Sequence, residues 1–302
     1  VRQVVRRLAA RGAVITLASR HAVAARFLRP MGDVGQIAAI DVGIGEEATI
    51  ARLVEGSDIV ICAAGTLSEK GGNRFDTVYR RGPAALARHA AASGIKRFVH
   101  FSVIGNDARS PCAYLRAKAA GEAAVREAFP AATILRPSLI FGPDDQAINA
   151  LGALAKLAPA MPVLGNGGTR YQPVFVGDVA DAVTAVLDRA DTEGKIYELG
   201  GPEIVTYRQL LEMILRIVGR KRLLVPVPAP IAAALAFPLE FLPVPPLTRD
   251  QVKLALTENV VGPGMPGLEA LGVVPTALGL ILPTYLDRFR RGGWYAPVTQ
   301  AP

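Results

Sequence analysis

Short apolar runs alternate with helical segments along the first half of this 302-residue chain, and this alternation constrains the fold more than any other feature. Parallel strands covered by helices on both faces give such continuous apolar runs, whereas half-exposed strands alternate apolar and polar residues. The sequence therefore predicts an α/β fold built on a doubly wound parallel sheet. The expected strands span 13–20, 37–41, 58–62, 98–102 and 132–135, and the expected helices span 1–9, 46–54, 78–92 and 110–129.

One of these helices carries a pair of residues with chemical potential, Tyr114 and Lys118, and it is expected to begin with Ser110-Pro111 as N-cap and first-turn residue. Residues four apart share one helix face, so the phenol and the ammonium group can point at one ligand. A phenol with a reference pKa of ~10 is a poor acid at neutral pH, and a neighbouring cation favours its phenolate form. Hydride-transfer enzymes need this pairing, and the family resemblance described below implies that Ser102, at the end of the preceding strand, belongs to the same candidate catalytic set.

The chain opens inside an amphipathic helix, because Val1, Val4, Val5 and Leu8 repeat at helical spacing and Gly12 follows as a stop. In a dinucleotide-binding fold, a strand and a glycine-rich turn precede that helix and supply backbone N–H groups for the pyrophosphate. We expect this first strand and loop to be missing from the chain, upstream of Val1.

The alternation loosens from about residue 144. We therefore expect an NAD(P)-binding Rossmann domain at 1–143, lacking its amino-terminal strand, and a smaller carboxyl-terminal α/β lobe at 144–302 for substrate or partner, partly interleaved with the sheet. In the lobe, strands are expected at 172–176 and 197–202 and helices at 179–187 and 207–218, followed by a proline-rich apolar remainder.

Composition excludes several classes of function. The net charge is +8 and the pI near 9.8, but the basic residues are scattered without aromatic interleaving, so nucleic-acid binding is not expected. Two cysteines and three histidines are too few for a disulfide framework or a metal site, and Cys62 is interpreted as a buried hydrophobe. Glu122 is interpreted as a helix-surface carboxylate, Asp178 as a helix N-cap, and Gly165–Arg170 as a turn.

Several segments carry a resemblance to a known family, and they are Leu28–Ile37, Tyr114–Glu122, Arg136–Ser138 with Ile140–Gly142, Gln172–Val174 with Asp178-Val179, and Thr248–Val252. The chain resembles the extended and atypical short-chain dehydrogenase/reductases. It is most similar to the NADPH-binding accessory subunit of respiratory complex I and its bacterial relatives. The resemblance runs from the first residue to about Phe289.

The resemblance implies a cofactor site at the carboxyl ends of the strands, with Arg170 reaching toward the substrate. The implied cofactor residues are Arg20, Asp41, Val42, Ala63, Ala64, Gly65, Tyr114, Lys118, Pro137, Ser138, Leu139 and Ile140. Ser19-Arg20 offers a hydroxyl and a cation where a carboxylate would hold the adenosine ribose of NAD. We therefore expect NADP(H) to be favoured over NAD(H).

Two departures from the family pattern weaken catalysis. Val103 and Ile104 follow Ser102 where family enzymes usually place a second hydroxyl, and Tyr79 stands where an asparagine is common. We therefore expect an accessory protein of a respiratory NADH:quinone oxidoreductase-type complex, cytoplasmic or peripheral to the inner membrane. The alternative is an active NADP(H)-dependent reductase, dehydrogenase or epimerase with an apolar substrate, and a third class is a redox-sensing regulator. The apolar segment 223–247, flanked by Arg220–Arg222 and Arg249, is predicted to meet the complex or an anionic membrane.

Overall fold

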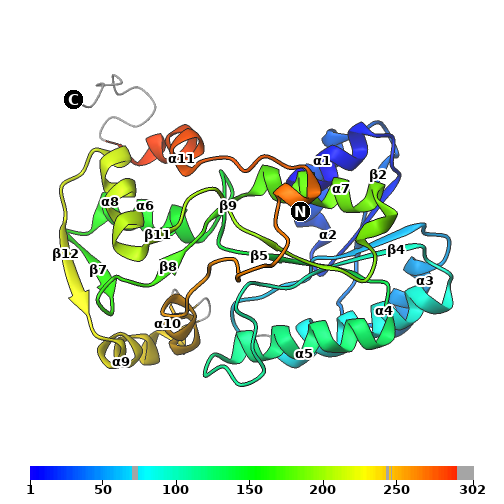
Figure 1. The fold of residues 1–302 in the computed structure, drawn as a ribbon, viewed down its shortest axis with the longest axis horizontal. Coiled ribbons are helices and arrows are strands. Elements are labelled where there is room, and N and C mark those ends of the chain that lie inside the picture. Colours follow the sequence, from blue (N-terminus) through cyan, green and yellow to red (C-terminus); the bar gives the residue numbers. More distant parts are fainter. Residues whose placement is uncertain (70–73, 243–244, 246, 291–302) are drawn as a thin grey trace. The chain divides into compact units, whose positions relative to one another are not determined.

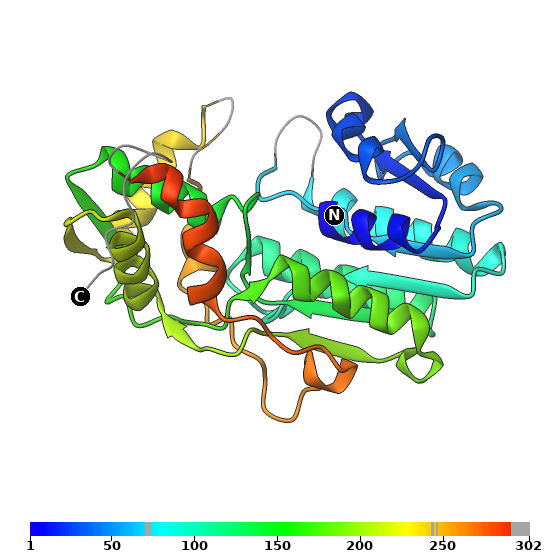
Figure 2. The ribbon, with the colours of Figure 1, turned by 90° about the horizontal axis from the view of Figure 1, so that it is seen from above.

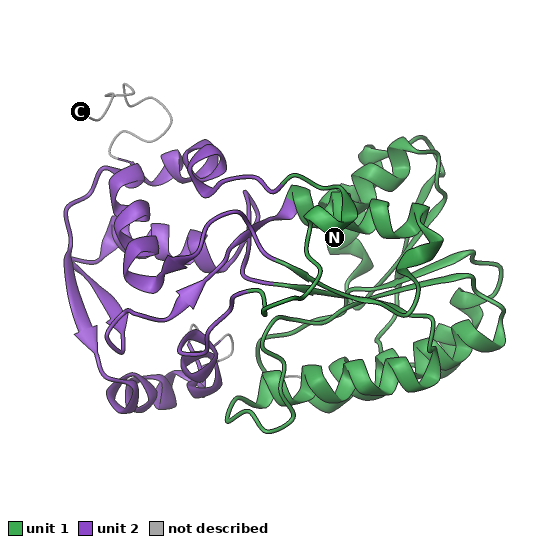
Figure 3. Cartoon of the chain, viewed as in Figure 1, with its two compact units in different colours: residues 1–137, 177–199, 261–274 green, residues 138–176, 200–260, 275–302 purple. Residues whose placement is uncertain are grey.

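The computed structural model describes residues 1–69, 74–242, 245 and 247–290. Figure 1 shows their helices and strands, and Figure 3 the two compact units that they form. Unit 1 comprises 1–137, 177–199 and 261–274, and unit 2 comprises 138–176, 200–260 and 275–302. The sequence prediction placed the domain boundary after residue 143, with the second lobe partly interleaved with the sheet. The chain first enters unit 2 after Pro137 and later returns twice to unit 1.

Unit 1 is built on parallel strands, as expected. Four of them form one sheet in the order β10-β5-β4-β3, and β1 and β2 form a separate parallel pair. Cys62 of β3 is the register partner of His100 of β4, and Ile134 of β5 is the partner of Ile196 of β10. The strands are β1 (Ile15–Ser19), β2 (Ile37–Asp41), β3 (Ile59–Cys62), β4 (Arg97–Phe101), β5 (Thr133–Pro137) and β10 (Ile196–Leu199).

Helices cover both faces of the four-stranded sheet, which confirms the doubly wound fold. Figure 1 shows α4 and α5 along one face and α7 along the other, and Figure 2 gives the same unit from above. Phe98 and Ile134 of the sheet pack against Val125 of α5 in a core that is almost fully buried. The helices are α1 (Arg2–Ala10), α2 (Ala22–Ala25), α3 (Glu47–Val54), α4 (Gly82–Ala92), α5 (Ala113–Ala128) and α7 (Val176–Asp188).

The strands β1 and β3 both have an edge that no other described strand covers, since β1 pairs with β2, β3 pairs with β4, and no pairing joins the two sheets. Ile59 at the start of β3 is 42% exposed, although its strand was expected to be buried. A further parallel strand would pair with such edges. The first strand and glycine-rich turn expected from the sequence stay a prediction.

Two helix starts differ from the sequence prediction. The helix expected at 78–92 is a π-helix at Asp76–Arg81 followed by α4, because Pro83 has no N–H to donate into a regular helical ladder. The helix α5 begins at Ala113 and not at Pro111, so the N-cap prediction was wrong. The Ser110 hydroxyl accepts a hydrogen bond from the N–H of Cys112 (3.1 Å) in a local turn that ends before the helix.

Unit 2 contains short strand pairs packed with helices. The helix α8 was predicted at its observed bounds. In the structure a Thr206–Gln209 capping box begins it and Gly219, in the left-handed conformation, ends it. The pairs β6–β9 and β7–β12 are parallel, and β8–β11 is antiparallel. The strands are β6 (Ile140–Phe141), β7 (Ala160–Leu164), β8 (Arg170–Tyr171), β9 (Val174–Phe175), β11 (Val205–Thr206) and β12 (Leu223–Val227); the helices are α6 (Ala147–Leu157), α8 (Tyr207–Val218), α9 (Ala229–Leu239), α10 (Arg249–Ala255) and α11 (Leu278–Leu286).

The apolar remainder of the chain thus holds three helices that were not predicted, α9, α10 and α11, and prolines lie inside α9 and α11. Over the described part of the chain, none of the helices combines the length and the apolar character needed to cross a bilayer.

Candidate functional site

Lys118 of α5 is buried, with only 6% of its surface exposed. Its Nζ donates a hydrogen bond to the carbonyl oxygen of Phe101 at the end of β4 (2.9 Å) and lies 4.5 Å from the centroid of the Tyr79 ring. Burial lowers the pKa of Lys118 to about 8, and the nearby Glu122 carboxylate offsets only part of this effect. The ammonium group is therefore held by a carbonyl and an aromatic ring, at the carboxyl end of the sheet.

Tyr79 is the residue around which this site is assembled. Its Oη accepts from the N–H of Thr66 (2.7 Å) and donates to the carbonyl oxygen of the same residue, so it anchors the turn after β3. Its ring meets Tyr114 edge-on, with centroids 5.4 Å apart. Burial raises the pKa of Tyr79 to about 12, so the hydroxyl stays protonated. The sequence marked Tyr79 only as a departure from the family pattern; the structure places it between Lys118, Tyr114 and the turn.

The close approach of α5 to the π-helix that carries Tyr79 depends on Gly121. A Cβ atom at position 121 would lie 1.8 Å from the carbonyl oxygen of Tyr79. Only glycine allows the two backbones to come this near. Gly121 therefore allows the close packing that places the Tyr79 ring next to the Lys118 ammonium group.

Tyr114 has the opposite electrostatic environment from the one expected of a general acid. Its hydroxyl is buried, and burial, with Tyr79 and Cys112 nearby, raises the pKa of Tyr114 above its ordinary value. The Lys118 charge is not among the influences on this pKa. The phenol therefore remains neutral at physiological pH in this arrangement, and the Lys118 ammonium group lies over the ring of Tyr79.

Ser102 belongs to a buried polar network and is 4% exposed. Its Oγ accepts from the Nδ2 of Asn106 (2.9 Å), and the same amide donates to the Glu122 carboxylate (2.7 Å). Arg136 of β5 pairs with Glu122 (2.6 and 3.0 Å) and with Glu198 of β10 (3.1 Å). The interpretation of Glu122 as a surface carboxylate is wrong, because Arg136 neutralises it inside the fold.

One signal in the sequence could have suggested that Glu122 is buried. It lies four residues after Lys118 and so shares the same face of α5. Although burial opposes ionisation, the guanidinium of Arg136 and the amide of Asn106 hold the pKa of Glu122 below its usual value. Asp178, expected as an N-cap, lies buried in the first turn of α7, so that interpretation is also wrong.

The proposed adenosine side of the site lies at the ends of β1, β2 and β3. Arg20, Ala63 and Gly65 are exposed there, whereas Val42 is buried. The Asp41 carboxylate accepts from the N–H of Ala22 (2.6 Å), which starts α2. An exposed cation after β1 and an exposed small-residue turn at Ala63–Gly65, with Ala64 between, fit a phosphate-bearing dinucleotide that approaches the backbone closely.

The remaining site predictions fall on both units. Pro137 ends β5 in unit 1, while Ser138, Leu139 and Ile140 belong to unit 2. In unit 2 the Ser138 hydroxyl donates to the carbonyl oxygen of Gln172, and the N–H of Leu139 donates to the Oδ1 of Asn259 (2.6 Å). Ile140 is the register partner of Val174. The cofactor roles of these residues stay predictions.

Arg170, expected to face the substrate, is exposed and paired with Glu258 in unit 2. Its Nε and one terminal nitrogen each lie 2.8 Å from a carboxylate oxygen. This bidentate pair occupies the guanidinium fork. A substrate role for Arg170 stays a prediction.

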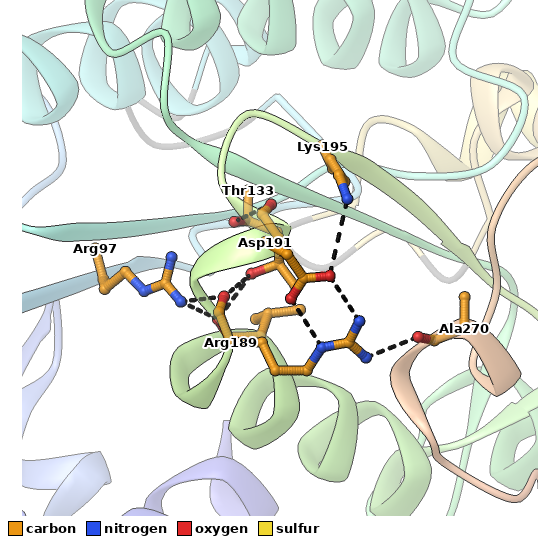
Figure 4. A network of polar contacts seen from close by, with 8 residues as sticks. Arg97, Thr133, Arg189, Asp191, Lys195 and Ala270 are labelled. Atoms are coloured by element: carbon orange, nitrogen blue, oxygen red, sulfur yellow. Dashed lines mark hydrogen bonds and ion pairs between the residues drawn. The ribbon is translucent and has the colours of Figure 1, made fainter.

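A second polar network of unit 1 lies at the amino end of β4, away from the candidate site (Figure 4). Arg97 donates to the carbonyl oxygens of Val186 (3.0 Å) and Arg189 at the end of α7. Arg189 pairs with Asp191 (2.8 Å) and donates to the carbonyl oxygen of Ala270 (2.8 Å). These contacts tie the returning segment 261–274 to unit 1, so we assign them a structural role. In the described residues no group of three or more His, Cys, Asp or Glu could hold a metal ion.

The parallel sheet, its covering helices and the Tyr-x-x-x-Lys helix define a Rossmann-type protein of the short-chain dehydrogenase class. The sequence pattern of the NAD dependent epimerase/dehydratase family matches residues 2–200, and the chain belongs to this family. A mutant UDP-glucuronic acid 4-epimerase from Bacillus cereus, solved with NAD, has the same fold: the TM-score is 0.71 at 15% identity, over 95% of each chain.

Two curated relatives are similar in sequence. NADH dehydrogenase [ubiquinone] 1 alpha subcomplex subunit 9, mitochondrial, of Arabidopsis thaliana is 34% identical over 279 residues, which cover 89% of this chain and 69% of the relative. A ceramide reductase of Caulobacter vibrioides is 34% identical over 142 residues, which cover 47% of this chain and 44% of the relative. The predicted resemblance to accessory subunits of respiratory complex I is confirmed.

Proposed function

We propose that this protein binds NADP(H) and serves as an accessory protein of a respiratory NADH:quinone oxidoreductase-type complex, peripheral to the inner membrane. Its family and its similarity to a complex I subunit over most of the chain support this proposal. In such a role the dinucleotide stabilises the fold, and turnover is absent or slow.

The observation that carries the proposal is the placement of the Lys118 cation. It is directed to the Phe101 carbonyl oxygen and the Tyr79 ring, while burial raises the pKa of Tyr114. A general acid works best with a pKa near the working pH, so a phenol made less acidic by burial is poorly placed for proton transfer. Lys118 would hold ribose hydroxyls of the dinucleotide, whose nicotinamide supplies hydride chemistry when bound.

Arg20 is the residue that favours NADP(H). It is exposed at the end of β1, where a guanidinium suits a 2′-phosphate. Calorimetric titration of NADPH and NADH tests this preference. We expect Arg20→Ala to weaken NADPH binding about 10- to 150-fold, the equivalent of one charge-assisted contact, and to leave NADH binding unchanged. Arg26→Ala, at a nearby exposed arginine, is the matched control. Equal affinities for both dinucleotides in the wild type would refute the NADP(H) assignment.

The alternative function is an active NADP(H)-dependent reductase, dehydrogenase or epimerase on an apolar substrate, which the similarity to a ceramide reductase favours. Turnover assays with long-chain ketones separate the two functions. In an active enzyme, Tyr114→Phe should lower the rate by about 10²- to 10⁴-fold and spare dinucleotide binding. In both functions Lys118→Ala should weaken dinucleotide binding, and retained full affinity in this variant would contradict the site.

The surface that we propose for the partner lies on β12, on α9 and on the residues that directly follow α9 in unit 2. Its exposed apolar side chains are Leu223, Ile231, Leu235, Phe237, Phe241 and Leu242. Residues 243, 244 and 246 of the predicted segment lie outside the described residues. Exposed apolar groups in such number mark a binding surface.

Charge contributes less to this surface than the sequence suggested. Arg249 pairs with Glu240 (3.0 Å) and stacks on the ring of Phe237, and Arg222 donates to the carbonyl oxygen of Ala155 (3.0 Å). These two cations are already engaged within unit 2. We therefore propose that apolar contact supplies most of the attraction to the complex or membrane.

A further inference from the structure

His100 of β4 is buried and has no hydrogen-bond partner among the described residues. Only 3% of its surface is exposed, and neither Nδ1 nor Nε2 meets a donor or acceptor of the protein. A neutral imidazole carries one donor and one acceptor nitrogen, and both are costly to bury unpaired. A buried group of this kind calls for an explanation beyond packing.

The imidazole lies between the sheet and α5. Side chains two residues apart along a strand share one face, so His100 points with Phe98, which packs against Val125 of α5. Its register partner on β3 is Cys62, a member of the same core. The ring is thus covered by a helix on one side and flanked by a thiol on the neighbouring strand.

Two charged groups of α5 act on this imidazole. Lys118 and Glu122 lie one helical turn apart, and both influence the ionisation of His100. Burial, aided by the Lys118 charge, lowers the pKa of His100 to about 3, so the ring is neutral at physiological pH. The Cys62 thiol stays uncharged, because burial raises its pKa to about 11. The groups facing the imidazole are therefore one cation, one anion and a neutral thiol.

Lys118 has donors to spare on the same side. An ammonium group has three N–H bonds, and one of them goes to the carbonyl oxygen of Phe101, the residue that follows His100. One nitrogen of the His100 imidazole and one N–H of Lys118 supply two polar partners, and an ordered buried water requires two to four.

We propose that His100 holds an ordered water molecule beneath α5, shared with the ammonium group of Lys118, and that this water keeps Lys118 charged. His100 is then a positioning residue that acts on the candidate site through Lys118. This role goes beyond the proposed function and does not depend on it, because both groups belong to the protein without a dinucleotide.

Nitrogen NMR of the imidazole rings tests the bound water directly. The chain has three histidines, so ¹⁵N-histidine labelling gives a spectrum that a His100→Gln sample assigns. We expect one His100 nitrogen to show the shift of a hydrogen-bonded atom and one ring proton to show a cross-relaxation peak with water. Shifts of non-bonded nitrogens with no water peak would overturn the proposal.

Titration of Lys118 tests the coupling. In wild-type protein labelled with ¹³C at lysine Cε, we expect Lys118 to titrate below the ordinary lysine pKa, because burial lowers it. His100→Leu should lower it by about one to two pH units, the worth of a lost hydrogen bond to a charged group. His89→Gln, at a half-buried histidine beside Glu47, is the control and should leave it unchanged. An unchanged midpoint in His100→Leu, with a higher melting temperature from removing a costly buried polar group, would leave packing as the role of His100. If the Leu variant does not fold, the wild-type nitrogen spectrum decides.

Discussion

Arg136→Met is the sharpest test of how the interior of unit 1 is held together. Arg136 places three N–H groups on two buried carboxylates, with distances of 2.6 and 3.0 Å to Glu122 and 3.1 Å to Glu198. The side chains of Glu122 and Glu198 are only 6% and 8% exposed. Methionine keeps much of the volume and removes the cation. Breaking a buried ion pair from one side costs about 3–5 kcal/mol, because the partner charge stays buried without compensation.

The pH dependence gives this prediction its sign. In the wild type, the pKa of Glu122 is lowered because Arg136 and Asn106 outweigh burial, so the ionised carboxylate stabilises the fold above its unfolded pKa. That contribution is lost as the pH falls through the lower folded value. In Arg136→Met, burial acts without the cation and raises the pKa of Glu122, so ionisation destabilises the variant. The deficit should therefore be largest at pH 7–8 and shrink at pH 4–5.

Urea unfolding followed by far-UV circular dichroism at both pH values measures the effect. Arg170→Met is the matched control, since Arg170 makes an equally short bidentate pair with Glu258 on the surface and should change little. Glu122→Gln in the Arg136→Met background should recover part of the loss by removing one stranded charge. If Arg136→Met is no more destabilising than Arg170→Met, or if its deficit is independent of pH, the reasoning about the buried network is refuted.

Three further predictions concern Gly121, Lys118 and Phe241. Gly121→Ala should destabilise the protein by about 1–3 kcal/mol in urea unfolding, because its Cβ would lie 1.8 Å from the Tyr79 carbonyl oxygen; Gly279→Ala, with no atom within 4 Å, should be neutral or stabilising, and a reversed order would contradict the packing. Since burial lowers the pKa of Lys118 from 10.5 to about 8, the wild-type stability should rise with pH between these values and this rise should be absent in Lys118→Met; identical pH slopes would argue against burial of the charge. Phe241→Glu, at a side chain that is 73% exposed, should reduce flotation with anionic liposomes or purified membranes without lowering stability, and unchanged flotation would exclude the α9 surface.

Much of the fold was predictable because it is written in local patterns. Continuous apolar runs predicted the strands from β1 to β5 within two residues, and the helix predicted at 207–218 matches the observed bounds of α8. The helices α9 and α11 escaped prediction because they are apolar all round and contain prolines, so neither periodicity nor a stop signal marks them.

The candidate site was also predictable only in part. The sequence by itself determined that Tyr114 and Lys118 share a helix face, since four residues make about one helical turn. Only the tertiary structure decided where the Lys118 charge is directed. Phe101 and Tyr79 reach it from a strand and a π-helix that lie 17 and 39 positions away in the sequence.

The same holds for the buried polar groups. Glu122 was interpreted as a surface carboxylate because its partner Arg136 is distant in the sequence. Arg136 comes from β5, and it also pairs with Glu198 of β10. His100 likewise sits in an ordinary apolar strand pattern. The sequence records the type and spacing of each side chain, but burial and charge pairing depend on which strands and helices meet. Those long-range contacts set the pKa values of Lys118, Tyr114 and Glu122, and with them the chemistry that the site can perform.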